Sequence, residues 1–113
     1  MKKFQVQIAQ SAKRDLKDIV SYICFQLQEQ STAKKLHQKI KEQILELDHM
    51  PERYPLWEDE PWHSRGLRKL LVKNYYVFYL VNHAQDCVRV IRVMYAGRDV
   101  TTQLQEMDQN DFR

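Results

Sequence analysis

The 113-residue sequence has little of what marks several common protein classes. It contains only two glycines and three prolines, so long flexible linkers are not expected. No apolar run approaches the roughly 18 residues that a membrane-spanning helix needs. Residues 1–10 also lack the apolar stretch of a signal peptide. The sequence therefore predicts one cytoplasmic domain over residues 1–113, without a membrane partner.

Cysteine is equally scarce. Cys24 and Cys87 lie far apart in the sequence, and a reducing compartment favours two free thiols over a disulfide. Neither cysteine has neighbours suited to a metal site or a nucleophilic thiol, and the histidines show no metal-ligand spacing. We therefore expect neither a metal nor a cofactor.

The N-terminal half has two kinds of apolar period. Alternation at Phe4, Val6 and Ile8 predicts a strand over residues 4–8. Apolar residues then recur every three or four positions, which predicts helices from residue 12 to about 29 and from about 31 to 49, because Pro51 prevents continuation. Their short connection predicts an antiparallel hairpin. Its many lysines are interpreted as a solvated surface, with a nucleic-acid footprint as the alternative.

The C-terminal half has the period of strands. Residues 50–65 hold three prolines, two tryptophans and four acids, and predict an irregular segment. Strands follow at residues 67–72, 75–82 and 88–95. The predicted fold is α+β with the order β-α-α-β-β-β, in which a helical hairpin packs on one face of a small antiparallel sheet and leaves the other face open. Residues 99–113 are expected to form a short helix anchored by Leu104 and Met107, and then a frayed end.

Positive charge is concentrated in the predicted sheet. Residues 66–98 carry six Lys or Arg and a single acid, although the formal charge of the whole chain is only +3. A sheet with this charge indicates a polyanionic or acidic partner. The order and these segments, with "AKRDLKDIVSYI" in the first helix, Pro51 after the second, "GLRKLLVKNYYVFYLV" and "VRVIRVMYAGRDV", resemble the RelE/ParE superfamily of toxins from type II toxin–antitoxin systems.

The resemblance implies a toxin that arrests bacterial growth, and it leaves two targets open. RelE-type members cleave mRNA on the ribosome, for which the candidate catalytic residues are Arg98, Tyr95 and Arg68. ParE-type members inhibit DNA gyrase. Two positions depart from the nuclease pattern: Tyr76 stands where an arginine is frequent, and Leu104 stands six residues after Arg98, where a tyrosine is expected. The sequence is therefore closer to the ParE branch. A third reading is a non-toxic nucleic-acid-binding module.

The resemblance also implies two binding surfaces. A cognate antitoxin is expected to place an apolar helix in a groove of the hairpin and an acidic segment across the sheet. The candidate antitoxin-binding residues are Leu16, Ile19, Tyr22, Ile23, Leu36 and Ile40. The candidate target-binding residues, for gyrase or for the ribosome with mRNA, are Arg68, Lys69, Lys73, Arg89, Arg92 and Arg98.

Overall fold

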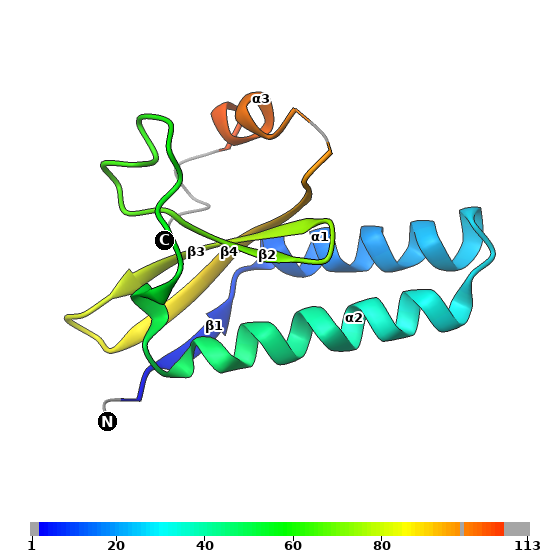
Figure 1. Ribbon diagram of the computed structural model, residues 1–113, viewed down its shortest axis with the longest axis horizontal. Coiled ribbons are helices and arrows are strands. Elements are labelled where there is room, and N and C mark those ends of the chain that lie inside the picture. Colours follow the sequence, from blue (N-terminus) through cyan, green and yellow to red (C-terminus); the bar gives the residue numbers. More distant parts are fainter. Residues whose placement is uncertain (1–2, 98, 108–113) are drawn as a thin grey trace.

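The computed structural model describes residues 3–97 and 99–107 (Figure 1). Its elements follow the predicted order β-α-α-β-β-β, with a short helix added at the end. They are β1 (Gln5–Ile8), α1 (Gln10–Ser21), the π-helix η1 (Tyr22–Gln26), α2 (Gln30–Leu45), the 3-10 turns η2 (Glu46–Asp48) and η3 (Pro51–Arg53), β2 (Arg68–Val72), β3 (Tyr75–Asn82), β4 (Cys87–Tyr95) and α3 (Val100–Gln105).

The strands form one mixed sheet in the order β1-β4-β3-β2. β2, β3 and β4 pair antiparallel in sequence order, as predicted. β1 instead pairs parallel with β4, from Gln5 opposite Cys87 to Ile8 opposite Val90, which corrects the expectation of a wholly antiparallel sheet. Local sequence patterns do not encode the direction of β1. Alternation fixes which face of a strand is buried, but two strands so far apart in sequence have no connecting turn to set their direction.

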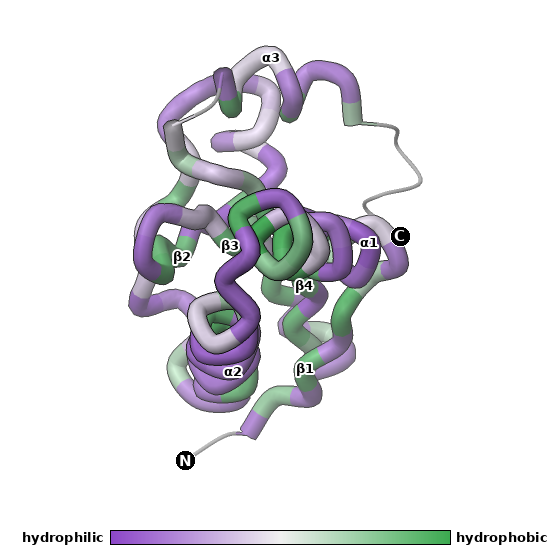
Figure 2. Tube along the Cα trace, turned by 90° about the vertical axis from the view of Figure 1, so that its right-hand side faces the viewer, coloured by the Kyte–Doolittle hydropathy of each residue, from purple (hydrophilic) through white to green (hydrophobic). Residues whose placement is uncertain are grey.

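The helical hairpin covers one face of the sheet, as predicted. Ala12 on α1 and Ile40 and Ile44 on α2 pack with Val77 and Val88 of the sheet in the main core. In Figure 2 the hydrophobic residues gather in the middle of the molecule, where the strands lie, whereas α2 is largely hydrophilic. The α+β class with a hairpin on one face is confirmed.

The opposite face of the sheet is not open, contrary to the prediction. A second core there contains Trp57, Trp62, Leu67, Phe78, Ile91, Met94, Val100, Leu104 and Met107. The tryptophans belong to the irregular segment and the last three residues to α3 and its end, so both segments cover this face (Figure 1). The sequence of β3 did indicate burial of both faces, because its near-continuous apolar run is typical of a strand buried on both sides. The expected frayed end falls on residues 108–113, outside the described part.

Asp99 begins α3. Its side chain accepts hydrogen bonds from the amide (3.2 Å) and the hydroxyl (2.5 Å) of Thr102, which satisfies one of the free amides at the start of the helix. Both hydrogen bonds lower the pKa of Asp99, and the bond from the Thr102 hydroxyl has the larger effect. None of the helices in the described residues is long and apolar enough to span a bilayer.

Candidate functional site

A groove of about 1050 Å³ runs between the helical hairpin and the end of the sheet. One wall comes from α1, η1 and the start of α2, and the other from the β2–β3 turn and the end of β4. We call this the edge groove. Four of the six candidate antitoxin-binding residues lie in it: Ile19, Tyr22, Ile23 and Leu36.

The edge groove exists because β1 is shorter than β4. β1 pairs only with Cys87–Val90, and the amide of Ala9 donates the last bond to the Val90 carbonyl at 2.8 Å. β4 continues to Tyr95 without β1 beside it. Beyond the end of β1, the Asp15 side chain lies beside β4 and accepts a hydrogen bond from the Val93 amide at 2.9 Å. The apolar wall of the hairpin therefore faces a strand edge rather than another strand.

Both signs of charge line the edge groove. Asp15, Asp18 and Glu29 stand on the hairpin, and Lys35, Lys73 and Arg92 are the cations in its lining. At the sheet end, the rings of Tyr75 and Tyr95 lie 5.5 Å apart. The Tyr95 ring lies so close to Gly97 that a β-carbon there would overlap it, so only glycine permits this position of the ring.

The other two candidate antitoxin-binding residues lie elsewhere. Leu16 lines a second groove, of about 700 Å³, whose polar lining includes His37 and the cations Lys13, Lys17, Lys34 and Lys41. Ile40 is 1% exposed and belongs to the main core. It therefore supports the hairpin from inside and offers no contact surface to a partner.

Three of the candidate target-binding cations have acidic or carbonyl partners. Arg68 donates to the carbonyl oxygens of Tyr54 (2.7 Å) and Glu52 (3.2 Å), and pairs with the Glu52 carboxylate at 3.4 Å. Arg92 binds Asp15 at 2.8 Å. Lys69 binds Glu58 at 2.8 Å, and this hydrogen bond is the main cause that lowers the pKa of Glu58.

Lys69 also lies 5.0 Å from the centre of the Trp57 ring and 5.8 Å from that of Tyr76. Its charge is therefore held by an acid and two aromatic faces on the side of the sheet away from the hairpin. Arg68, its neighbour, points to the other face, as strand alternation predicts. The two cations thus cannot act on one ligand from the same side.

The remaining candidate cations are placed differently. Lys73 is exposed in the β2–β3 turn, where its φ of 55° lies in the left-handed region. Arg89 is half-buried opposite Leu80, and its Nε is buried without a hydrogen-bond partner in the described residues. Arg98 lies outside the described residues. The cations therefore occur on both faces and at both ends of the sheet rather than as one cluster.

The candidate catalytic residues Arg68 and Tyr95 are not brought together. Tyr95 pairs with Tyr75, which pairs with Val72, whereas Arg68 starts β2 four residues earlier. Strand spacings then place the two residues about 15 Å apart, at opposite ends of the sheet. The third candidate, Arg98, is not among the described residues.

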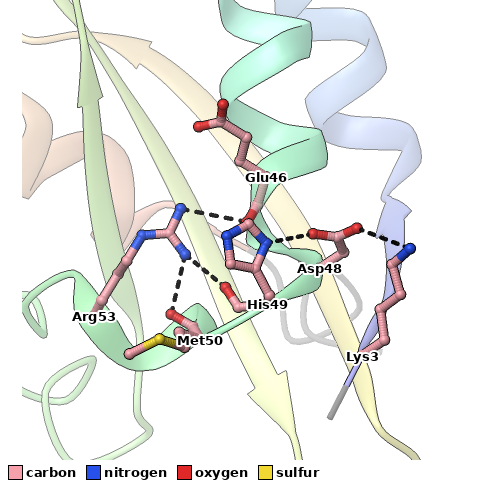
Figure 3. Close-up of polar contacts among 6 residues, drawn as sticks. All are labelled: Lys3, Glu46, Asp48, His49, Met50 and Arg53. Atoms are coloured by element: carbon pink, nitrogen blue, oxygen red, sulfur yellow. Dashed lines mark hydrogen bonds and ion pairs between the residues drawn. The ribbon is translucent and has the colours of Figure 1, made fainter. Parts of the chain in front are cut away.

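The segment between α2 and β2 is fixed by polar contacts (Figure 3). Arg53 donates to the carbonyl oxygens of His49 (2.6 Å), Met50 (3.2 Å) and Glu46 (3.3 Å). Asp48 contacts Nδ1 of His49 at 2.8 Å and Lys3 at 3.9 Å, and the hydrogen bond with His49 chiefly lowers its pKa. These contacts shape the turn and engage the Asp48 carboxylate.

The three acidic side chains of residues 58–60 do not converge on one site. All three residues are exposed, and each has its own partner. Glu58 binds Lys69, Asp59 accepts from Thr101 at 3.3 Å, and Glu60 accepts from Ser64 at 2.6 Å. The Ser64 hydroxyl is the main cause that lowers the pKa of Glu60. Across residues 3–97 and 99–107, no group of three or more His, Cys, Asp or Glu could hold a metal ion.

Sequence reasoning missed two residues that shape the site. Asp15 holds α1 against the free end of β4, and the buried Tyr79 donates from its hydroxyl to the Pro51 carbonyl at 2.6 Å. Asp15 carried a usable signal, because it lies four residues before Ile19 and therefore on the same side of the predicted helix. Tyr79 carried none, since its partner is a backbone atom 28 residues away.

Comparison with known proteins gives a consistent result. The family model described as "ParE toxin of type II toxin-antitoxin system, parDE" matches residues 6–100. A search of curated protein sequences gave no significant match. Among solved structures, the chain is similar to that of a chromosomal ParDE system from P. aeruginosa, with 19% identity, 84% of this chain and 98% of that chain covered, and a TM-score of 0.68.

Two further structures are similar. The RelBE2 toxin–antitoxin complex from Mycobacterium tuberculosis gives 17% identity, covers 82% of this chain and 98% of that chain, and has a TM-score of 0.63. A mutant E. coli RelE toxin in the free state gives 14% identity, covers 89% of this chain and 92% of that chain, and has a TM-score of 0.61. At these identities the structural likeness establishes the fold.

Proposed function

The chain belongs to the ParE toxin family of type II toxin–antitoxin systems, and on this basis we propose that it arrests growth by inhibiting DNA gyrase and that a cognate antitoxin neutralises it. The family match extends from β1 to the start of α3, so it covers the whole sheet and the hairpin. No covalent chemistry is required of such an inhibitor, which acts by binding. The proposal therefore needs accessible surfaces rather than a catalytic centre.

The observation that favours gyrase over mRNA is the separation of Arg68 from Tyr95. Cleavage of RNA by attack of the ribose 2′-OH requires a base, an acid and cations within hydrogen-bond reach of one phosphate. Arg68 and Tyr95 lie at opposite ends of the sheet. Arg68, Lys69 and Arg92 are also engaged by partners of their own. Tyr76 occupies a position where the nuclease pattern has an arginine.

The antitoxin is proposed to occupy the edge groove. Ile19, Ile23 and Leu36 supply an apolar wall, and Tyr22 is 56% exposed at its rim. Two similar structures are of a ParDE system and a RelBE2 toxin–antitoxin complex, which supports a partner of this kind. An amphipathic antitoxin segment would bury its apolar side against these residues and present carboxylates to Lys35 and Lys73.

Lys73, Arg89 and Arg98 remain the proposed cations for contact with the target. Lys73 is exposed beside the edge groove, so an antitoxin segment in the groove would also mask it. We propose mainly structural roles for Arg68, Lys69 and Arg92, because each has a partner within the fold. Their substitution is expected to affect the stability of the fold together with activity.

The test is to induce the chain without its antitoxin and to assay it purified against gyrase. The expected result is growth arrest, with relaxed or broken plasmid DNA and intact translated mRNA. Addition of one equivalent of antitoxin is expected to restore supercoiling by gyrase. Cleaved mRNA with normal DNA would show a ribosome-dependent nuclease instead. Unaffected growth, with salt-sensitive binding to DNA or RNA, would show a non-toxic binding module.

A further inference from the structure

The turn of the helical hairpin has almost no charge. Residues 21–32 contain a single charged side chain, Glu29, in a protein in which 29% of the residues are charged. The nearest charge before this stretch in the sequence is Asp18, so the charges closest to the turn on both sides are acids. This composition is opposite to that of a surface built for phosphate or for an anionic membrane.

The same turn exposes large apolar side chains. Phe25 is 71% exposed, Tyr22 56% and Leu27 50%. We call these three residues the hairpin tip. Phe25 is the most exposed large hydrophobic residue in the part of the chain that the structure describes. The turn projects beyond the sheet, at the end of the hairpin farthest from the N-terminus (Figure 1). Three large exposed apolar side chains within six residues of one turn indicate a surface that binds a protein partner.

The backbone of the tip is an ordered but irregular structure. The π-helix η1 closes with a bond from the Leu27 amide to the Tyr22 carbonyl at 3.2 Å, and the Glu29 amide reaches the Ile23 carbonyl at 3.1 Å. Gln28 has a φ of 54°, a conformation that usually favours glycine or asparagine. The wider π-turn changes the direction of the residues that follow the regular helix. π-turns and left-handed non-glycine residues both occur preferentially at functional sites.

Size and charge identify the kind of partner. Three side chains cannot supply the roughly 800 Å² per partner of a stable dimer, so a second copy of this chain is a poor occupant. A projecting knob can be enclosed on several sides only by a concave surface. Residues 21–32 contain no Lys or Arg, so the tip itself offers no cation to a polyanion. The features therefore fit an apolar cleft on a larger protein.

We propose that the hairpin tip is one contact of this toxin with gyrase, additional to the cations proposed above, in which Phe25 inserts into an apolar cleft and Tyr22 and Leu27 pack beside it. This inference rests on the proposed function. It also accounts for neutralisation, because Tyr22 and Leu27 line the edge groove as well. An antitoxin segment in that groove occupies the flanks of the tip, so the antitoxin and gyrase bind in competition.

Substitution of Phe25 tests gyrase binding separately from antitoxin binding, because Phe25 does not line the edge groove. The experiment compares wild-type protein with Phe25→Ala, Phe25→Trp and Leu45→Ala. Leu45 is 53% exposed on α2, and so provides a matched loss of exposed apolar surface away from the tip. Each full-length variant is purified through its antitoxin complex. Inhibition of gyrase supercoiling, antitoxin affinity and melting temperature are then measured.

The expected result is that Phe25→Ala raises the concentration for half-inhibition at least about tenfold, as truncation of an aromatic anchor does. Phe25→Trp and Leu45→Ala retain inhibition, and all variants bind the antitoxin within about threefold of wild type, the scatter expected for a residue outside that interface. Equal inhibition by wild type and Phe25→Ala would overturn the assignment of the tip while leaving gyrase inhibition intact.

Other outcomes overturn the assignment in different ways. Loss of antitoxin binding by Phe25→Ala would assign the tip to the antitoxin. A wild-type dimer that Phe25→Ala dissociates would assign it to a second copy. Wild-type binding to phosphatidylcholine vesicles that Phe25→Ala abolishes would assign it to a membrane. A wild-type protein that does not inhibit gyrase would overturn the proposed function first, and the assignment of the tip with it.

Discussion

Asp15 on α1 and Arg92 on β4 form a two-bond ion pair across 77 residues of sequence. Arg92 donates to Asp15 from Nε at 2.8 Å and from Nη2 at 3.1 Å, and Asp15 also accepts from the Val93 amide. The Asp15 side chain is 16% exposed and the Arg92 side chain 23%, so water competes with this pair only in part. The contact joins the hairpin to the sheet where β1 no longer lies beside β4.

Asp15→Ala is expected to lower the free energy of unfolding by about 2 kcal/mol, because it leaves a half-buried guanidinium and a backbone amide without this acceptor. Asp15→Asn keeps one acceptor oxygen and should cost about 1 kcal/mol. Denaturant unfolding of the purified chain measures both. Asp18→Asn, one turn later on an exposed site, is the control and should stay within about 0.5 kcal/mol of wild type. Equal effects of Asp15→Ala and Asp18→Asn would contradict the structural role.

Tyr79→Phe is expected to cost about 1–2 kcal/mol, because it leaves the buried Pro51 carbonyl without its donor. Burial raises the pKa of Tyr79, so the folded protein holds this proton more tightly than the unfolded chain does. The stabilisation linked to this proton is complete below the unfolded value of 10.0, and it declines as the pH rises beyond that value.

Denaturant unfolding between pH 7 and 11 tests this linkage. Wild type should lose stability above pH 10 more steeply than Tyr79→Phe does, so the gap between them should narrow. Tyr22→Phe, which alters an exposed ring, controls for general alkaline effects. A gap that stays constant up to pH 11 would contradict the linkage.

The sequence predicts the strands well and their assembly only in part. Strands expected at 67–72, 75–82 and 88–95 are found at Arg68–Val72, Tyr75–Asn82 and Cys87–Tyr95, because alternation and short turns are local signals. The parallel pairing of β1 with β4 depends on residues that are distant in sequence, so no local pattern encodes it. The predicted first helix was expected to reach residue 29, but η1 replaces its last turn.

The candidate site was predictable to the same degree. Ile19, Tyr22, Ile23 and Leu36 are among the candidate antitoxin-binding residues that the resemblance implies, and they line the edge groove. Periodicity could not show that Ile40 is fully buried, because facing the sheet and facing a groove give the same pattern. It could not show the acid partners of Arg68, Lys69 and Arg92 either, since these come from other elements.

Asp99→Ala is expected to detach α3 from the second core, because Asp99 supplies the acceptor that begins this helix. Trp57 and Trp62 both lie in that core, so the tryptophan fluorescence of the protein should shift to the red at pH 7. The lowered pKa of Asp99 means that its contribution is present above the unfolded value of 3.8, and is lost as the pH falls through the lower folded value.

Asp99→Asn is the matched variant, because asparagine also begins helices well but does not titrate. It should keep the wild-type emission at pH 7 and lack the part of the acid shift that wild type shows below pH 3.8. Identical acid titrations of wild type and Asp99→Asn would show that another carboxylate controls α3.

Tyr95→Phe separates the two targets that the superfamily offers. Tyr95 is 45% exposed, and its ring packs against Tyr75 and covers Gly97, contacts that phenylalanine preserves. A binding inhibitor should therefore keep its growth arrest and its half-inhibition of gyrase within about threefold, since only one exposed hydroxyl is lost. A nuclease that uses this hydroxyl as its general acid or base should lose about 10²–10⁴ in cleavage rate. Tyr95→Ala is the control for packing. If Tyr95→Phe abolishes toxicity while the protein remains folded, the hydroxyl takes part in catalysis, and inhibition of gyrase by binding no longer explains the arrest.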